Sequence, residues 1–204
     1  MITPETAVRH EASLAVWNLA SPVVIGRSAT LKIGISCPWG CVLAGTTIEI
    51  RDQHGALLGS GVIGSEPWPG STALYWGEID AVAPDVEGAH AWSVHGIPID
   101  SAHDPLNGIV RVIASRPPEH RLTIDVIEHG TGVPLGDVEL RVGAFRATTN
   151  EAGRAHVDVP GGAYDVHAWK MGHDLLSTTT HVAGDAAIQL EVVATRQAEQ
   201  PYWM

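Results

Sequence analysis

Short runs in which apolar and polar residues alternate recur along almost the whole chain, and no long run repeats at helical spacing. In SATLKIGISC (28–37), for example, Leu31, Ile33 and Ile35 fall on one face of an extended strand. Turns separate these runs at the spacing of about 8–12 residues that is typical of β-sandwiches. The 22 glycines and 13 prolines suit so many turns. The sequence therefore predicts an all-β protein without a substantial helix.

The segment RPPEH (116–120) interrupts this rhythm, because its two prolines remove two backbone hydrogen-bond donors. We place a domain boundary there and predict two consecutive β-sandwich domains. The first is an immunoglobulin-like sandwich with an N-terminal extension (1–117). The second is another sandwich (118–195), and residues 196–204 form a hydrophobic C-terminal tail.

The second half resembles the carboxypeptidase regulatory-like family, which has a transthyretin-like β-sandwich. The resembling segments are TGVPLGDVELRV (131–142), TTNEAGRAHVDVPGGAYDVHAWKMGH (148–173) and AIQLEV (187–192). His173 stands where the family usually has an aromatic residue. The resemblance covers roughly 120–195 and implies a transthyretin-like fold in an accessory role. Transthyretin-like hydroxyisourate hydrolases end in Tyr-Arg-Gly-Ser, whereas this chain ends in PYWM. That activity is therefore not expected.

The chain carries a formal net charge of −11, which excludes two classes of partner. An acidic chain without a cluster of Lys or Arg repels a nucleic-acid backbone and an anionic membrane surface. The first residues lack a basic segment followed by an apolar run, and no apolar stretch reaches the ~18 residues of a membrane span. We expect a cytoplasmic protein, with a mature exported chain as the alternative.

The triplet His-Ala-Trp occurs twice, at 90–92 and at 167–169. When the two strands are aligned on their preceding Gly-Ala pairs, His90 corresponds to Tyr164 and Trp92 corresponds to Val166. Alternation along a strand then points these four side chains inward. The two triplets are out of register, so they do not form a repeated ligand motif. We expect His90 to be hydrogen-bonded in the manner of a tyrosine corner.

The only cysteines, Cys37 and Cys41, lie in SCPWGC. Three residues separate them rather than the two of a thioredoxin-like motif. A turn through Pro38 and Gly40 could bring them close enough for a structural disulfide, or they could remain a thiol pair that clamps the loop. Together with distant histidines they could also form a zinc site.

The segment HGIPIDSAHDPLNG (95–108) predicts a long loop between two strands. It contains His95, Asp100, His103 and Asp104, and two imidazoles with two carboxylates can ligate zinc or a similar divalent metal. The alternative is a polar connection that only forms turns. No other cofactor is indicated.

Aromatic residues outside the predicted cores indicate contacts with a partner. The candidates are a loop tryptophan, an outward-facing pair on one strand and two aromatics in the tail: Trp68, His167, Trp169, Tyr202 and Trp203.

The leading hypothesis is a non-catalytic accessory protein that docks onto a protein partner, such as an enzyme subunit or a second copy of itself. The alternatives are a metal-binding protein that uses loop histidines and a carbohydrate-binding module. An enzyme is not expected, although an active site shared with another chain stays open. GSGVIG (59–64) has the spacing of a dinucleotide motif, but no helix follows it.

Overall fold

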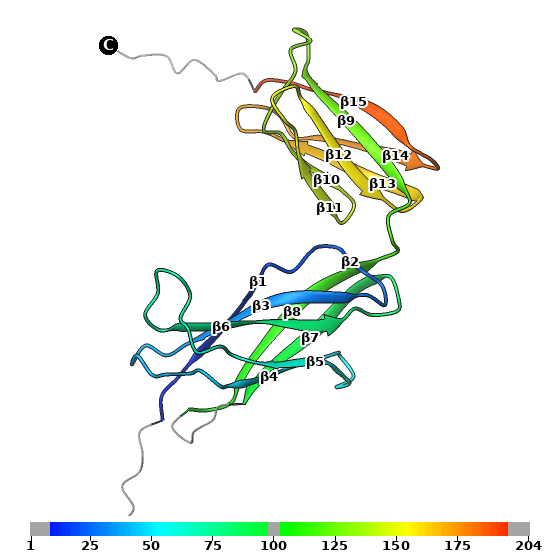
Figure 1. The fold of residues 1–204 in the computed structure, drawn as a ribbon. Helices are drawn as coiled ribbons and strands as arrows, with labels where there is room; N and C mark the ends of the chain where they lie inside the picture. Colours follow the sequence, from blue (N-terminus) through cyan, green and yellow to red (C-terminus); the bar gives the residue numbers. More distant parts are fainter. Residues whose placement is uncertain (1–8, 98–102, 196–204) are drawn as a thin grey trace, which may run out of the picture. The chain divides into compact units, whose positions relative to one another are not determined.

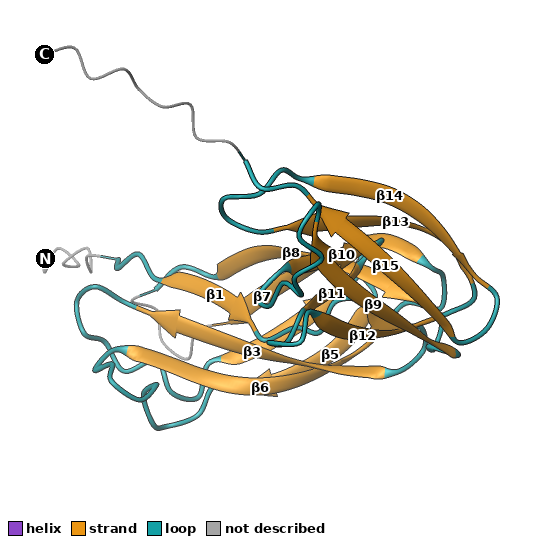
Figure 2. Cartoon of the chain, turned by 90° about the horizontal axis from the view of Figure 1, so that it is seen from above, coloured by secondary structure: helices purple, strands orange, loops and turns teal. Residues whose placement is uncertain are grey.

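The computed structural model describes residues 9–97 and 103–195, and these residues form strands, turns and loops without a helix (Figures 1 and 2). The all-β class predicted from the sequence is confirmed. Within the described ranges there is accordingly no helix long and apolar enough to span a membrane. The chain divides between Arg116 and Pro117 into two compact units.

The first unit is a sandwich of two sheets. One sheet has the order β1-β3-β6, and the other has the order β2-β8-β7-β4-β5. Most neighbours are antiparallel, and the short β2 runs parallel to β8. The strands are β1 (Ser13–Trp17), β2 (Val23–Val24), β3 (Ser28–Ser36), β4 (Thr47–Arg51), β5 (Leu57–Val62), β6 (Leu74–Val82), β7 (Gly88–Ile97) and β8 (Leu106–Ser115).

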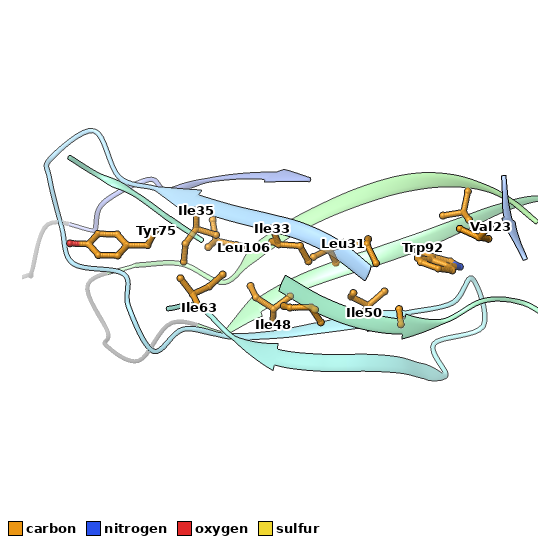
Figure 3. Packing of buried hydrophobic residues seen from close by; sticks show 14 of the residues in the cluster. Val23, Leu31, Ile33, Ile35, Ile48, Ile50, Ile63, Tyr75, Trp92 and Leu106 are labelled. Carbon is orange, nitrogen blue, oxygen red and sulfur yellow. The ribbon is translucent and has the colours of Figure 1, made fainter. Parts of the chain in front are cut away.

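The core of the first unit lies between its two sheets. The predicted inward series of β3 is fully buried, and it faces Ile48 and Ile50 of β4 (Figure 3). Trp92 of β7 lies in the same layer with no exposed surface. Its place confirms the inward face predicted for this strand.

The glycine-rich segment 59–64 lies partly in β5, and in the described part of the chain no helix follows it. It therefore lacks the helix N-terminus of a dinucleotide motif. Its glycines let β5 approach β6 closely, because a Cβ atom added at Gly59 would lie 2.0 Å from the carbonyl oxygen of Asp80. A Cβ atom at Gly61 would meet the side chain of Ile79 at 3.0 Å. The glycines are therefore explained by the packing of the sandwich.

The second unit is also a two-sheet sandwich, with a four-stranded sheet (β11-β10-β13-β14) and a three-stranded sheet (β12-β9-β15). Strands β9 and β15 are parallel, and the other pairs are antiparallel. Its core is built largely from valine, leucine and alanine. The strands are β9 (His120–Glu128), β10 (Glu139–Val142), β11 (Phe145–Thr148), β12 (Arg154–Val159), β13 (Gly162–Trp169), β14 (Leu176–Val182) and β15 (Ala186–Val192).

Candidate metal centre

Two thiols and two imidazoles from three separate segments meet at one end of the first unit. Their ligand atoms, one from each of His10, Cys37, Cys41 and His103, all lie within 4.8 Å of one another. His10 precedes β1, the cysteines follow β3, and His103 precedes β8. Cys37 and His103 are buried, whereas His10 and Cys41 are half-buried.

The position of Cys37 follows from the alternation of β3. Residues 31, 33 and 35 point into the core, and Cys37 is the next residue in this inward series, with only 1% of its surface exposed. The chain then turns at once. The N–H of Gly40 donates to the carbonyl oxygen of Cys37 at 3.0 Å, and Gly40 has a φ of 71°, which favours glycine. This turn brings Cys41 back beside Cys37.

The position of His10 follows from the pairing of β1 with β3. Ser13 lies opposite Ser36 in this antiparallel register, so the chain before Ser13 runs beside the cysteine loop. The ring of His10 accordingly stacks on that of Trp39, with centroids 5.5 Å apart and an interplanar angle of 21°. The Nδ1 atom of His10 lies 3.1 Å from the Sγ atom of Cys41.

His103 is brought to the same place by contacts with the N-terminal segment. His10 and His103 form an isolated parallel bridge, and their rings meet edge to face with centroids 5.6 Å apart. Their chain neighbours, Arg9 and Asp104, form an exposed ion pair. Two successive residues on each segment therefore hold the segments together.

The surroundings of Cys37 favour its thiolate form. Burial by itself would raise the pKa of this thiol. The backbone N–H of Trp39, the ring of His103 and the neighbouring Cys41 outweigh burial, and together they lower the pKa of Cys37 below its ordinary value. A thiolate is the form in which cysteine binds a metal.

The donor set and its spacing fit a four-coordinate soft or borderline metal ion. Zinc bonds of about 2.3 Å to sulfur and 2.0–2.1 Å to nitrogen imply ligand atoms roughly 3.3–3.8 Å apart in a tetrahedron. Ligand atoms that lie within 4.8 Å of one another would need to move inward by about 1 Å at most. Four protein ligands leave no coordination position for a substrate, which is the arrangement of structural rather than catalytic sites.

The structure does not bring together the four residues that the 95–108 segment offered as metal ligands. Of those described, only His103 joins the cluster. His95 lies within β7, and its Nδ1 atom is 2.7 Å from Oδ1 of Asn107 in the paired strand. Asp104 forms an ion pair with Arg9. Asp100 lies outside the described residues. Strand β7 extends to Ile97, so His95 lies in a strand rather than in the predicted loop, and it is not part of the cluster.

The structure places the two cysteines beside His10, a residue that the sequence did not indicate. Cys37 and Cys41 are not joined by a disulfide in the structure. They meet two histidines distant in the sequence, as the zinc alternative requires. His10 was missed because no local spacing marks it. Only the β1–β3 register places it at the site.

The residues predicted to contact a partner are dispersed over the chain. The ring of Trp68 packs edge to face against Trp17 and Trp76, with centroids 5.2 and 5.0 Å apart, and so covers its own sandwich. His167 is half-buried and Trp169 is 47% exposed on β13. Tyr202 and Trp203 lie outside the described residues.

Comparisons with known proteins add similarities of a general kind. No protein-family model matches the chain, and neither does any curated protein sequence. Among solved structures, the major pilin subunit of Bacillus cereus matches with a TM-score of 0.34 at 10% identity, over 88% of this chain and 70% of the pilin. The TIE protein of Bacillus anthracis matches with a TM-score of 0.31 at 11% identity, over 90% of this chain and 41% of that protein.

A third similar structure is the CARDB domain of a Pyrococcus furiosus protein, determined in complex with di-metal ions. It matches with a TM-score of 0.36 at 11% identity, over 55% of this chain and all (100%) of the domain. TM-scores of this size do not establish a common fold, so the description as two β-sandwiches rests on the strands and sheets of this chain.

Proposed function

We propose that this protein is a non-catalytic metal-binding protein that holds one zinc ion in its first unit. His10, Cys37, Cys41 and His103 would be the four ligands. The observation that carries the proposal is the convergence of their ligand atoms within 4.8 Å from three segments far apart in the sequence. Two thiols and two imidazoles form one of the common donor sets of structural zinc sites.

The zinc ion would fasten the segments that close one end of the first sandwich. His10 belongs to the segment before β1, the cysteines belong to the β3–β4 loop, and His103 belongs to the β7–β8 connection. Leu43 of the β3–β4 loop lies in the core, and Ala12 before β1 packs against it. A metal ion would add a direct cross-link between the three segments at this end. Zinc that binds the folded first unit would stabilise it by an amount that grows with the logarithm of the free zinc concentration above the Kd.

Metal content of matched variants tests this proposal. We expect the full chain, purified without a metal-affinity step, to carry about one zinc ion per chain by plasma mass spectrometry, as one structural site requires. Cys37→Ser and His103→Ala are each expected to lose most of it. His95→Ala is the matched control, because His95 is a histidine of the same region whose ring contacts Asn107 instead.

Two results would contradict the proposal. One is a chain that takes up no zinc when the ion is supplied to the reduced protein. The other is equal loss of zinc in His95→Ala and His103→Ala. Circular dichroism of each variant shows whether the sandwich is still folded, and His10→Gln provides a further ligand variant at a half-buried position.

A second candidate function, docking onto a partner as an accessory module, concerns the second unit. It is favoured by exposed apolar side chains: Trp169, Met171, Leu175 and Val193 are 47%, 82%, 64% and 47% exposed. The N–H of Asp174 donates to the carbonyl oxygen of Val193 at 2.8 Å, which places the 171–175 segment beside residue 193. An accessory role also agrees with the resemblance of 120–195 to the carboxypeptidase regulatory-like family.

The partner that we propose for this apolar end is a second copy of the chain. If two copies dock through this end, substitution of Trp169 and Met171 by serine should weaken the dimer. Sedimentation equilibrium of the variant and of the unmodified chain measures this change. A monomer at all concentrations would overturn docking between copies.

A further inference from the structure

We propose that Cys41 is an oxidation site, and that peroxide converts Cys37 and Cys41 into a disulfide that expels the bound metal. The inference rests on the proposed function for the metal and on the geometry of the thiols for the oxidation. The turn closed by Gly40 holds the two cysteines side by side, and the two thiols interact with each other. The two cysteines do not form a disulfide in the structure, so both sulfurs start in the reduced form.

The two thiols differ in their access to solvent. Cys37 is 1% exposed at the end of the inward series of β3, whereas Cys41 is half-buried on the far side of the turn. The Nδ1 atom of His10 lies 3.1 Å from the Sγ atom of Cys41, on the accessible side of the pair. Peroxide would therefore meet Cys41 first, and the sheltered Cys37 would act as the resolving thiol.

The chemistry balances in two steps with hydrogen peroxide as the named oxidant. In the first step the Cys41 thiolate attacks one peroxide oxygen and the O–O bond breaks. Cys41 becomes a sulfenic acid, and the released hydroxide takes up a proton to become water. In the second step the Cys37 thiolate attacks the Cys41 sulfur. A sulfur–sulfur bond forms, and the displaced hydroxide leaves as a second water molecule. The two sulfurs together lose two electrons, and the peroxide gains them.

Oxidation and metal binding exclude each other at this site. A disulfide has no thiolate to offer a metal, and the two remaining imidazoles form too weak a site to retain it. The new bridge closes a loop of only a few residues, so it adds little chain-entropy stabilisation and stays open to reduction. A thiol reductant would restore the thiol form after the oxidant is removed.

The experiment follows zinc and sulfur together on the full chain. Zinc-loaded, reduced protein is treated with hydrogen peroxide while a chromogenic chelator reports free zinc and mass spectrometry reports the thiols. We expect one zinc ion to be released for each Cys37–Cys41 disulfide formed, and we expect dithiothreitol with added zinc to reverse both changes. The His95→Ala control should respond as the unmodified chain does.

Two single variants, treated without metal, assign the roles of the thiols. Cys37→Ser should accumulate a sulfenic acid on Cys41 that dimedone traps, because no resolving thiol remains. Cys41→Ser should lose most of this labelling, because Cys37 is sheltered. Equal labelling of both variants would overturn the assignment of Cys41 as the first site of attack.

Failure of this inference is distinguishable from failure of the proposed function. If the reduced chain binds zinc but peroxide yields no disulfide, or yields a disulfide without release, the oxidation switch is wrong and the metal site stands. If the reduced chain binds no zinc, the proposed function is wrong. The release of metal then falls with it, and the dimedone labelling still decides whether Cys41 is the oxidation site.

Discussion

Strand β7 of the first unit and strand β13 of the second unit begin with equivalent hydrogen bonds made by different side chains. The Nε2 atom of His90 lies 2.8 Å from the carbonyl oxygen of Val86, four residues earlier. The hydroxyl of Tyr164 donates to the carbonyl oxygen of Pro160, also four residues earlier and at 2.8 Å. The two residues occupy corresponding positions in the alignment of the strands. The imidazole of His90 in the first unit thus makes the hydrogen bond that the phenol of Tyr164 makes in the second unit.

Other histidines of the two units lie beside different kinds of side chain. In the second unit, Nδ1 of His129 lies 2.9 Å from a carboxylate oxygen of Glu191, and Nε2 of His173 lies 3.7 Å from one of Glu128. In the first unit His10 and His103 meet thiols instead. An imidazole beside a carboxylate makes an ion pair when it is protonated, whereas imidazoles beside two cysteines offer the donor set that zinc prefers. The eleven histidines of this chain are therefore interpreted by their neighbours rather than by their number.

The largest expected effect breaks the comparison at a pair of corresponding core positions. Trp92 and Val166 are both fully buried on the inward faces of β7 and β13. Trp92→Ala should lower the free energy of unfolding of the first unit by about 3–5 kcal/mol, because it empties the space of an indole ring. Val166→Ala should cost the second unit about 1–2 kcal/mol, because only two methyl groups are removed. Hydrogen exchange of the full chain reports each unit separately, and equal losses would contradict this account.

A glycine substitution tests how closely the sheets approach in the first unit. Gly59→Ala places a Cβ atom against the carbonyl oxygen of Asp80, and we expect a loss of about 1–3 kcal/mol in stability. Gly184→Ala in the second unit is the control, because no atom lies within 4 Å of the added Cβ. Thermal unfolding of both variants decides the point. An unchanged midpoint for Gly59→Ala would show that β5 and β6 do not approach as described.

The equivalence of the two strand-start hydrogen bonds can be measured directly. Tyr164→Phe removes the hydroxyl that binds Pro160 and should cost the second unit about 0.5–1.5 kcal/mol. His90→Phe should cost the first unit a similar amount, because its ring nitrogen binds Val86 in the same way. Urea unfolding monitored by hydrogen exchange compares the two. If only one substitution is destabilising, the structural equivalence of these residues is wrong.

The smallest effect expected is a dependence on pH in the second unit. The pKa values of Asp125 and Asp158 are lowered, chiefly by hydrogen bonds from Arg154 and Arg121. A carboxyl whose pKa is lower in the folded state contributes stability above its unfolded pKa and loses it as the pH falls through the folded pKa. We expect the second unit to lose stability below about pH 4, the ordinary range of an aspartate.

Because these ion pairs are exposed, the loss should be small. Replacing both aspartates by asparagine should flatten the acid limb of the second unit's stability curve. A curve that keeps its full acid dependence in that variant would assign the effect to other carboxylates. Asp52 of the first unit, whose pKa is lowered chiefly by the backbone N–H of Ala56, provides a comparison within the same chain.

The strands of this protein could be predicted because their signal is local. Alternation fixed which residues of β3 and β7 face inward, and Leu31, Ile33, Ile35 and Trp92 are buried accordingly. The candidate site could be predicted only in part, because its residues meet through tertiary contacts. The sequence pointed to Cys37, Cys41 and His103, although it grouped them in different sites. Nothing in the local sequence distinguishes His10. The alternating segment 88–96 already favoured a strand that includes His95, and β7 confirms it.

X-ray absorption at the zinc edge of the reduced chain tests directly whether two cysteines and two histidines bind the zinc ion. We expect two sulfur atoms at about 2.3 Å and two imidazole nitrogens at about 2.0–2.1 Å from the metal. Cys37→Ser should reduce the sulfur contribution, while His95→Ala should leave the spectrum unchanged. A shell composed only of nitrogen and oxygen would contradict the assignment of Cys37 and Cys41 as ligands, and with it the metal centre described for the first unit.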